Sequence, residues 1–239
     1  LASDVNTEND EGSPSFSHSF DEFFFTRCDY SERRESTCAI FSSKRTENKW
    51  GEPVKISFSD DKNDSVLVAH PALSPDGLKL YFVSDMPGGF GGYDLWYVTR
   101  QSKEAEWSKE PVNMGAIVNT KGDEVYPYVR YDSVFYFSSN GHQGMGGLDI
   151  FRINYDENKI EQIVNLMYPM NSPGDDFGIS FFRGVEAGYF SSNRKGSLGF
   201  DDIYFFTLPP LKFVASGIIK DDNTGQKFSE TKVSLIGSD

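Results

Sequence analysis

The sequence predicts an all-β fold in which one structural unit recurs along the chain. Three similar stretches carry this prediction: Leu80–Trp96, Phe135–Phe151 and Gly188–Tyr204. Each contains an aromatic pair, a small polar pair, a glycine-rich loop, and an aspartate followed by two bulky apolar residues. These aspartates follow one another at intervals of 55 and 53 residues. A repeat of about this length with strand-like content is typical of a β-propeller blade.

We expect four repeat units, at about residues 15–59, 60–125, 126–176 and 177–208. Each offers about four short strands separated by turn signals, and no helical periodicity interrupts them. Residues 1–14 are interpreted as the tail of a preceding unit, because Val5-Asn6-Thr7 matches Val118-Asn119-Thr120. The propeller is therefore expected over residues 1–210, and the parent ring is expected to have five or more blades.

The second residue of each aromatic pair is expected to lie in the core. The strand residues alternate, yet both alternating sets are apolar, which fits a strand packed between two neighbouring sheets. We therefore predict that the equivalent phenylalanines are buried between blades: Phe82, Phe137 and Phe190.

The turns and loops also carry recurring residues. In the Ser-Pro-Asp-Gly turn of the second unit, Asp76 can bond to nearby backbone and Gly77 tolerates a positive φ. The aspartates that close the glycine loops are expected to accept hydrogen bonds from loop backbone, a cation held with loop carbonyls being the alternative. They are Asp94, Asp149 and Asp202.

The two cysteines, Cys28 and Cys38, flank the hairpin loop of the first unit. Paired strands approach closely enough for a disulfide there, so we expect the bridge, with two free or buried thiols as the alternative. A metal pair is disfavoured, because no further Cys or clustered His completes a ligand set. A bridge would indicate an oxidising compartment such as a periplasm.

The charge and hydropathy of the chain disfavour two classes of partner. The net charge is −13 and the pI is about 4.7, which disfavours nucleic acid and anionic membranes. No apolar run approaches the roughly 18 residues of a membrane span, so no direct membrane insertion is expected.

No pattern for catalysis or cofactor binding emerges. The glycine loop at Pro87–Gly92 leads into a strand, whereas a phosphate cradle requires a following helix. The three histidines, His18, His70 and His142, occupy non-equivalent places in different units without a triad pattern. The pairs Asp175-Asp176 and Asp201-Asp202 are candidates for the channel mouth, and no metal site is predicted from them. We therefore expect no catalytic residues, no cofactor and no metal ion.

Two stretches resemble known families. Ser74–Gly77, followed by LYFVSD, a glycine loop and YDLW, resembles the WD-like Pro-Asp-Gly repeat of TolB and of many Bacteroidetes envelope proteins, a resemblance covering roughly residues 15–208. Residues 213–236 are similar to the opening of carboxypeptidase-regulatory-like domains, which implies the first strands of a β-sandwich over residues 211–239. The matching residues are Gly217, Asp222, Thr224, Gly225 and Val233, whereas Lys227 and Thr231 depart from the pattern.

This order of domains resembles the middle of OmpA-family outer-membrane lipoproteins, such as the PorE-type component of the type IX secretion system. The resemblance implies a non-catalytic, periplasmic, outer-membrane-associated scaffold that binds envelope or secretion-system proteins. Peptidoglycan would be contacted only through a domain outside this chain. The alternative is a carbohydrate-active or peptidase-associated propeller with acids at the channel mouth, and the recurring structural aspartates favour the scaffold.

Overall fold

The computed structural model describes residues 5–29, 37–47, 49–58, 66–131, 134–156, 159–208 and 217–228. The chain divides into two compact units, Leu1–Leu208 and Pro209–Asp239. This division falls two residues before the expected end of the propeller at residue 210. Among the described residues, no helical segment has the length and apolar character needed to cross a bilayer.

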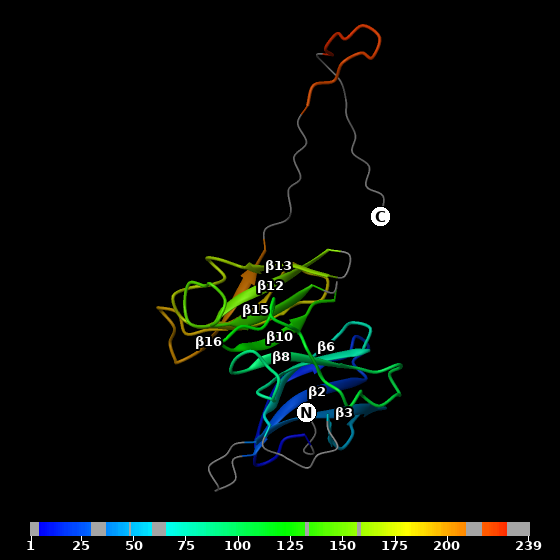
Figure 1. Ribbon diagram of the computed structural model, residues 1–239, viewed down its shortest axis with the longest axis vertical. Helices are drawn as coiled ribbons and strands as arrows, with labels where there is room; N and C mark the ends of the chain where they lie inside the picture. The colour runs from blue at the N-terminus through cyan, green and yellow to red at the C-terminus, as the bar shows by residue number, and fades with distance from the viewer. Residues whose placement is uncertain are drawn as a thin grey trace. The chain divides into compact units, whose positions relative to one another are not determined.

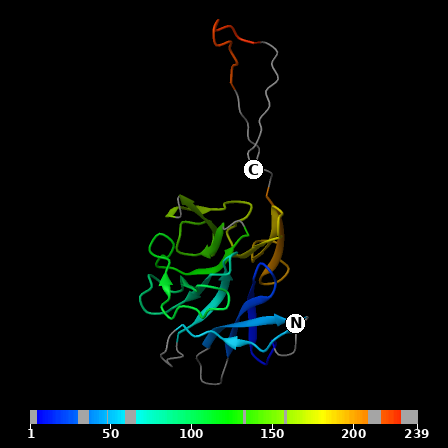
Figure 2. The same ribbon diagram turned by 90° about the vertical axis from the view of Figure 1, so that its right-hand side faces the viewer.

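The first unit confirms the predicted fold class, because its strands form four blades arranged as a β-propeller (Figures 1 and 2). The first blade contains β1 (Asp10–Phe16), β2 (Glu22–Asp29), β3 (Thr37–Thr46), β4 (Lys49–Trp50) and β5 (Val54–Lys55). The second contains β6 (Val68–Leu73), β7 (Lys79–Ser84), β8 (Asp94–Thr99) and β9 (Val112–Asn113).

The remaining two blades differ in their number of strands. The third contains β10 (Glu124–Val129), β11 (Phe135–Ser139), β12 (Asp149–Asp156) and β13 (Lys159–Asn165). The fourth contains β14 (Asp176–Phe181), β15 (Ala187–Ser192) and β16 (Asp202–Thr207). All the strand pairings within the blades are antiparallel.

Three of the four blades begin earlier than the sequence units predicted. The first strands begin at Asp10, Glu124 and Asp176, whereas the expected units began near residues 15, 126 and 177. Asp10–Pro14 therefore belongs to the first blade and not to the tail of a preceding unit. Each first strand contains a β-bulge, and in β1, β6 and β10 the bulge includes a proline, a residue that otherwise signals the end of a strand.

Each of these bulges contains one residue with a left-handed backbone. They are Ser13 (φ 50°), His70 (φ 49°), Tyr126 (φ 51°) and Gly178 (φ 65°). Such values are uncommon for residues other than glycine, and they cluster at sites where the surrounding structure enforces them. Here the four bulges occupy equivalent places in the four blades.

The hydrophobic core lies between successive blades. Phe82 joins a cluster of the first and second blades, Phe137 one of the second and third, and Phe190 one of the third and fourth. All three phenylalanines are buried. Burial of a phenylalanine side chain contributes about 1.5–3 kcal/mol, so each of these interfaces between blades stabilises the unit.

The second unit is described only over residues 217–228. Within it, the Asp221 carboxylate accepts hydrogen bonds from the backbone of Asn223 and Thr224, and Gly225 has a φ of 69°. An isolated bridge pairs Lys220 with Lys227. The other residues expected to form the first strands of a β-sandwich lie outside the described residues.

Candidate functional site

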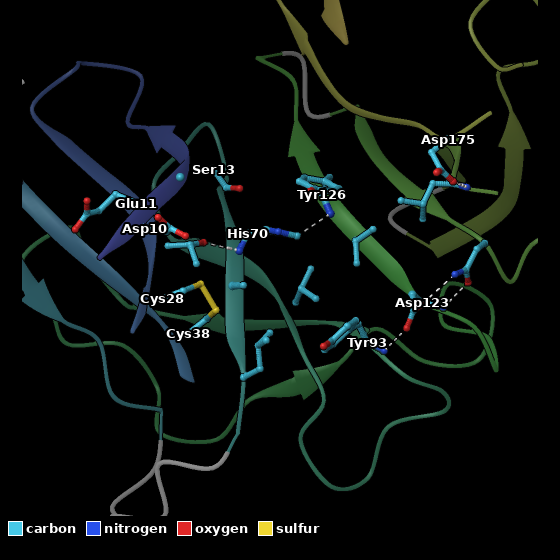
Figure 3. A pocket seen from close by; sticks show the side chains of 18 residues that line it. Asp10, Glu11, Ser13, Cys28, Cys38, His70, Tyr93, Asp123, Tyr126 and Asp175 are labelled. Atoms are coloured by element: carbon cyan, nitrogen blue, oxygen red, sulfur yellow. Dashed lines mark hydrogen bonds between the residues drawn. A yellow bond between two sulfur atoms is a disulfide. The ribbon is translucent and has the colours of Figure 1, made fainter. Parts of the chain in front are cut away.

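A cavity of about 580 Å³ lies among the first strands of the first three blades (Figure 3). Its volume falls within the roughly 300–1,000 Å³ typical of ligand sites. The walls combine apolar and aromatic side chains with several carboxylates. The residues lining it include Asp10, Leu67, His70, Asp123, Tyr126 and Asp175.

Two of the bulge residues form one wall of the cavity. The His70 and Tyr126 rings are stacked, with centroids 4.0 Å apart and planes inclined by 15°. The Tyr126 backbone N–H donates to His70 Nδ1 at 3.3 Å, and the His70 N–H donates to Thr26 Oγ1 at 2.9 Å (Figure 3). Because Nδ1 accepts a hydrogen bond, the neutral ring carries its proton on Nε2. The left-handed backbone at both residues directs this contact between two blades.

Burial determines the protonation states of the His70 and Tyr126 side chains in this wall. Loss of solvent around the imidazole lowers the pKa of His70 to about 4, because burial disfavours the charged form. Burial, assisted by the charge of Asp201, raises the pKa of the Tyr126 hydroxyl. Both rings are therefore neutral near neutral pH.

Two carboxylates at the rim link neighbouring blades. Asp123 accepts from the Tyr93 backbone N–H at 3.0 Å and from Asn140 Nδ2 at 3.0 Å (Figure 3). Asp175 of the fourth blade repeats this arrangement one blade further on. It accepts from the Leu148 backbone N–H at 2.8 Å and from Asn193 Nδ2 at 2.7 Å.

Two further carboxylates come from the first blade, and they differ in their partners. Glu11 forms an ion pair with Arg27 at 2.8 Å and accepts from the Thr7 hydroxyl at 2.6 Å. The Asp10 carboxylate is exposed and has no ion-pair or hydrogen-bond partner in the described part of the chain. Asp10 is therefore the carboxylate of this cavity least committed to holding the fold.

The aspartates predicted from the repeat lie outside the cavity, at the glycine loops. Asp94 accepts from the Gly91 backbone N–H at 3.2 Å and from Asn113 Nδ2 at 2.9 Å. Asp149 accepts from the backbone N–H groups of Met145 (2.8 Å) and Gly146 (3.0 Å). Both are buried, and each closes the loop before its strand.

Asp202 occupies the same place in the fourth blade but is partly exposed. Its carboxylate accepts from the Leu198 backbone N–H. The structure thus places all three predicted aspartates at loops and does not bring them together in one site.

The Pro-Asp-Gly turn of the second blade has the local geometry expected of it. Gly77 has a φ of 75° and donates its N–H to the Ser74 carbonyl at 2.8 Å. Asp76 accepts from Ser74 Oγ at 2.6 Å and from the Leu78 N–H at 2.9 Å. Partial burial opposes ionisation of Asp76, but these hydrogen bonds outweigh it and lower its pKa.

Cys28 and Cys38 lie opposite each other in the ladder of β2 and β3 and form a disulfide. Both cysteines line the cavity beside the first strand of their blade (Figure 3). The bridge therefore stiffens one wall of the cavity in addition to the hairpin.

Sequence reasoning missed the cavity and the role of His70, which it treated as an isolated histidine. A usable signal was present in the matching hexapeptides NTKGDE (Asn119–Glu124) and NSPGDD (Asn171–Asp176). They place Asp123 and Asp175 at equivalent positions directly before a first strand. The match between residues 5–7 and 118–120, extended to Asp10, adds the third aspartate.

The glycine loops also have a function beyond turn geometry. A Cβ atom on Gly91 would collide with the carbonyl oxygens of Gly122 and Thr120 in the segment that leads into the third blade. A Cβ atom on Gly146 would collide with the Gly174 carbonyl oxygen in the same way. These glycines therefore allow adjacent blades to approach closely at the rim.

The described residues contain no group of three or more His, Cys, Asp or Glu side chains suited to hold a metal ion. Asp123 and Asp175 at the rim are instead bound by amide donors. This arrangement fixes loops and can bind a ligand by charge.

Comparison with known proteins supports the fold and goes no further. No known protein family matches the chain, and no curated protein matches it. Among solved structures, an endo-arabinase from Bacteroides thetaiotaomicron matches with a TM-score of 0.54 and 11% identity, covering 91% of this chain and 80% of that one. A Mycobacterium tuberculosis puromycin-hydrolyzing peptidase matches with a TM-score of 0.49 and 13% identity, covering 91% and 33%.

At these identities the likeness shows the fold alone. The chain spans about a third or less of the length of the first peptidases that it matches. The fold and the cavity together define a β-propeller with an acidic cavity among its first strands. The resemblance to TolB-like and PorE-type proteins has no support from these comparisons and enters only the proposal below.

Proposed function

We propose that this chain is a non-catalytic scaffold that binds other proteins through the cavity side of its propeller. The observation that carries the proposal is that the carboxylates bind groups of the protein itself. Asp123 and Asp175 at the rim, like Asp94 and Asp149 at the loops, bind backbone N–H groups that fix neighbouring segments. Carboxylates in these roles stabilise the blades and are poorly placed to exchange protons with a substrate.

Hydrolysis of glycosides requires a pair of carboxyl groups on either side of the scissile bond. In the described part of the cavity, Asp10 is the one carboxylate without a structural partner. A single uncommitted carboxylate supports binding by charge over acid–base catalysis with two groups. The neutral His70 beside it accepts a hydrogen bond from backbone, which supports a structural role for the imidazole.

The cellular context belongs to the same proposal. The Cys28–Cys38 disulfide supports an oxidising compartment, and the acidic charge of the chain disfavours nucleic acid and anionic lipid as partners. With the resemblance to PorE-type lipoproteins, these features lead us to propose a periplasmic, outer-membrane-associated protein of type IX secretion. Its partners would be envelope or secretion-system proteins.

The competing proposal is a carbohydrate-active or peptidase-associated propeller. It draws on the endo-arabinase and peptidases among the proteins of similar fold, whose activities cannot be carried over at 11–16% identity. It requires a convergent set of acids at the channel mouth, and Asp10, Asp123 and Asp175 are the candidates.

The test is to crosslink the purified chain to envelope proteins of its source and to screen it against glycan and peptide libraries for turnover. We expect specific protein adducts and no hydrolysis. Absence of any protein adduct, together with hydrolysis that an Asp10→Ala substitution abolishes, would establish the enzyme instead.

A further inference from the structure

The charged side chains at the rim of the cavity are all negative. Three aspartates, Asp10, Asp123 and Asp175, line it, and no Lys or Arg is among the described residues that do so. The donors to Asp123 and Asp175 are neutral amides, so these hydrogen bonds leave the negative charge in place. A carboxylate has about four lone-pair sites, so each of the two can accept further hydrogen bonds.

This arrangement differs from that of two buried carboxylates of the same unit, Glu22 and Asp176, which face arginines. Glu22 pairs with Arg100 at 2.7 Å, and Asp176 pairs with Arg194 at 2.6 Å. At the cavity Arg27 pairs with Glu11, and among the described residues no Lys or Arg pairs with Asp10, Asp123 or Asp175. A cation at the rim has to come from another molecule.

The walls suit the rest of a basic side chain. Leu67, Leu148 and Val83 provide apolar surface, and Tyr93 and Tyr126 provide aromatic rings. Long basic side chains bury their aliphatic stems against such surface while the charged group stays at the polar rim. Aromatic faces add cation–π attraction. His70 adds no repulsion near neutral pH, because its buried ring is neutral.

We infer that the cavity receives a Lys or Arg side chain of a protein partner, in a segment that also carries apolar residues. This inference rests on the proposed function and specifies the partner segment that the same site binds. The guanidinium or ammonium group binds beside Asp10, where the negative charges of Asp123 and Asp175 across the cavity add to the attraction, while the apolar neighbours contact the walls. The cavity volume of about 580 Å³ leaves room for more than one side chain.

The repeat itself offers a change that strengthens the site. Leu67 occupies in the second blade the position that Asp123 and Asp175 occupy in the third and fourth. Its backbone N–H donates to Asp85 Oδ1 at 2.9 Å, just as Asp123 N–H donates to Asn140 Oδ1 at 2.7 Å. The double substitution Leu67→Asp/Asp85→Asn copies the Asp–Asn pair of the other blades and leaves the net charge of the chain unchanged.

The experiment begins with a positional-scanning hexapeptide library passed over the immobilised native chain. The best retained peptide and its twin with citrulline, a neutral analogue of arginine, are then titrated by fluorescence anisotropy. We expect retention of peptides with Arg or Lys beside apolar residues. We also expect a Kd about tenfold lower for the arginine peptide than for its twin at low salt, with a smaller ratio at high salt.

Two variants separate binding at the cavity from general attraction to an acidic protein. Asp10→Asn should weaken the arginine peptide about threefold to tenfold, whereas Glu110→Gln, which removes an exposed charge from the loop before β9, should leave its Kd unchanged. The Leu67→Asp/Asp85→Asn chain should bind it more tightly at the same net charge. Circular dichroism checks that each variant is folded.

Equal binding of the arginine and citrulline peptides would overturn the inference, as would equal effects of Asp10→Asn and Glu110→Gln. Enrichment of acidic or uncharged peptides would overturn it too. None of these results touches the proposed function, which crosslinking tests separately. A partner crosslinked only to another face would leave a scaffold but would contradict binding through the cavity side.

Discussion

The third and fourth blades share one motif but differ in what covers it. Ile150 follows the loop aspartate in the third blade and is 0% exposed, whereas Ile203 holds the same place in the fourth and is 76% exposed. Tyr136 is buried, and its equivalent Tyr189 is 42% exposed. The motif therefore sets the local strand and loop, while the neighbouring blade decides how much each residue stabilises the fold.

The contacts explain the difference. Ile150 packs in a cluster with Ile179 and Phe190 of the following blade. The side chain of Asn171 also binds both backbone groups of Ile150, accepting from its N–H at 2.8 Å and donating to its carbonyl at 2.9 Å. Among the described residues, Ile203 has no such asparagine.

The largest expected effect is in the buried interface. Phe137→Ala should lower the free energy of unfolding by about 3–5 kcal/mol, because it removes a fully buried ring between the second and third blades. Urea denaturation followed by fluorescence measures this value. A loss below about 1 kcal/mol would mean that this interface is not where the stability lies.

The two isoleucines give the direct comparison. Ile150→Ala should cost about 2–5 kcal/mol and Ile203→Ala less than about 0.5 kcal/mol, because only the first leaves a cavity. The pair is measured in the same urea series. Similar losses of stability for both variants would show that Ile203 of the fourth blade is buried in solution.

The bulge position holds a titratable histidine, His70, in the second blade and a glycine, Gly178, in the fourth. The free energy of unfolding is therefore expected to depend on pH through His70. The pKa of His70 is about 4 in the fold and about 6.5 in the unfolded chain. As pH falls from 6.5 to 4, the unfolded state binds the proton first, so the fold loses about 3 kcal/mol from this group. His70→Gly, which places the residue type of Gly178 at the equivalent position, should remove this part of the acid sensitivity. Denaturation curves that shift equally with pH in both chains would contradict it.

The loop aspartates are expected to give smaller effects than the buried Phe137 and Ile150. Asp149→Ala should cost about 1–3 kcal/mol, because it leaves two loop N–H groups without their acceptor, and Asp202→Ala should cost less in its more exposed loop. Hydrogen exchange of residues 144–148 reports the loop directly. A larger loss for Asp202→Ala would reverse the comparison.

The sequence predicts the parts of this molecule that depend on local pattern. Period, aromatic pairs and turn chemistry are sufficient for the four blades and for a buried Phe137. The cavity depends on residues separated by about 50 to 110 positions, such as Asp10 and Asp123, and on which side of each strand faces the centre. A proline usually signals the end of a strand, but the bulges at His70 and Tyr126 keep the prolines that follow them within a strand. Strand alternation alone therefore does not predict where the His70 and Tyr126 rings lie.

The central functional claim is that a protein partner binds on the cavity side of the propeller. The most direct measurement places a photocrosslinking amino acid at Asn140 on the cavity rim and, separately, at Glu110 outside it, and exposes both chains to envelope proteins of the source. The account predicts a discrete polypeptide adduct from position 140 and none from position 110. Adducts from position 110 alone, or none from either position, would contradict it.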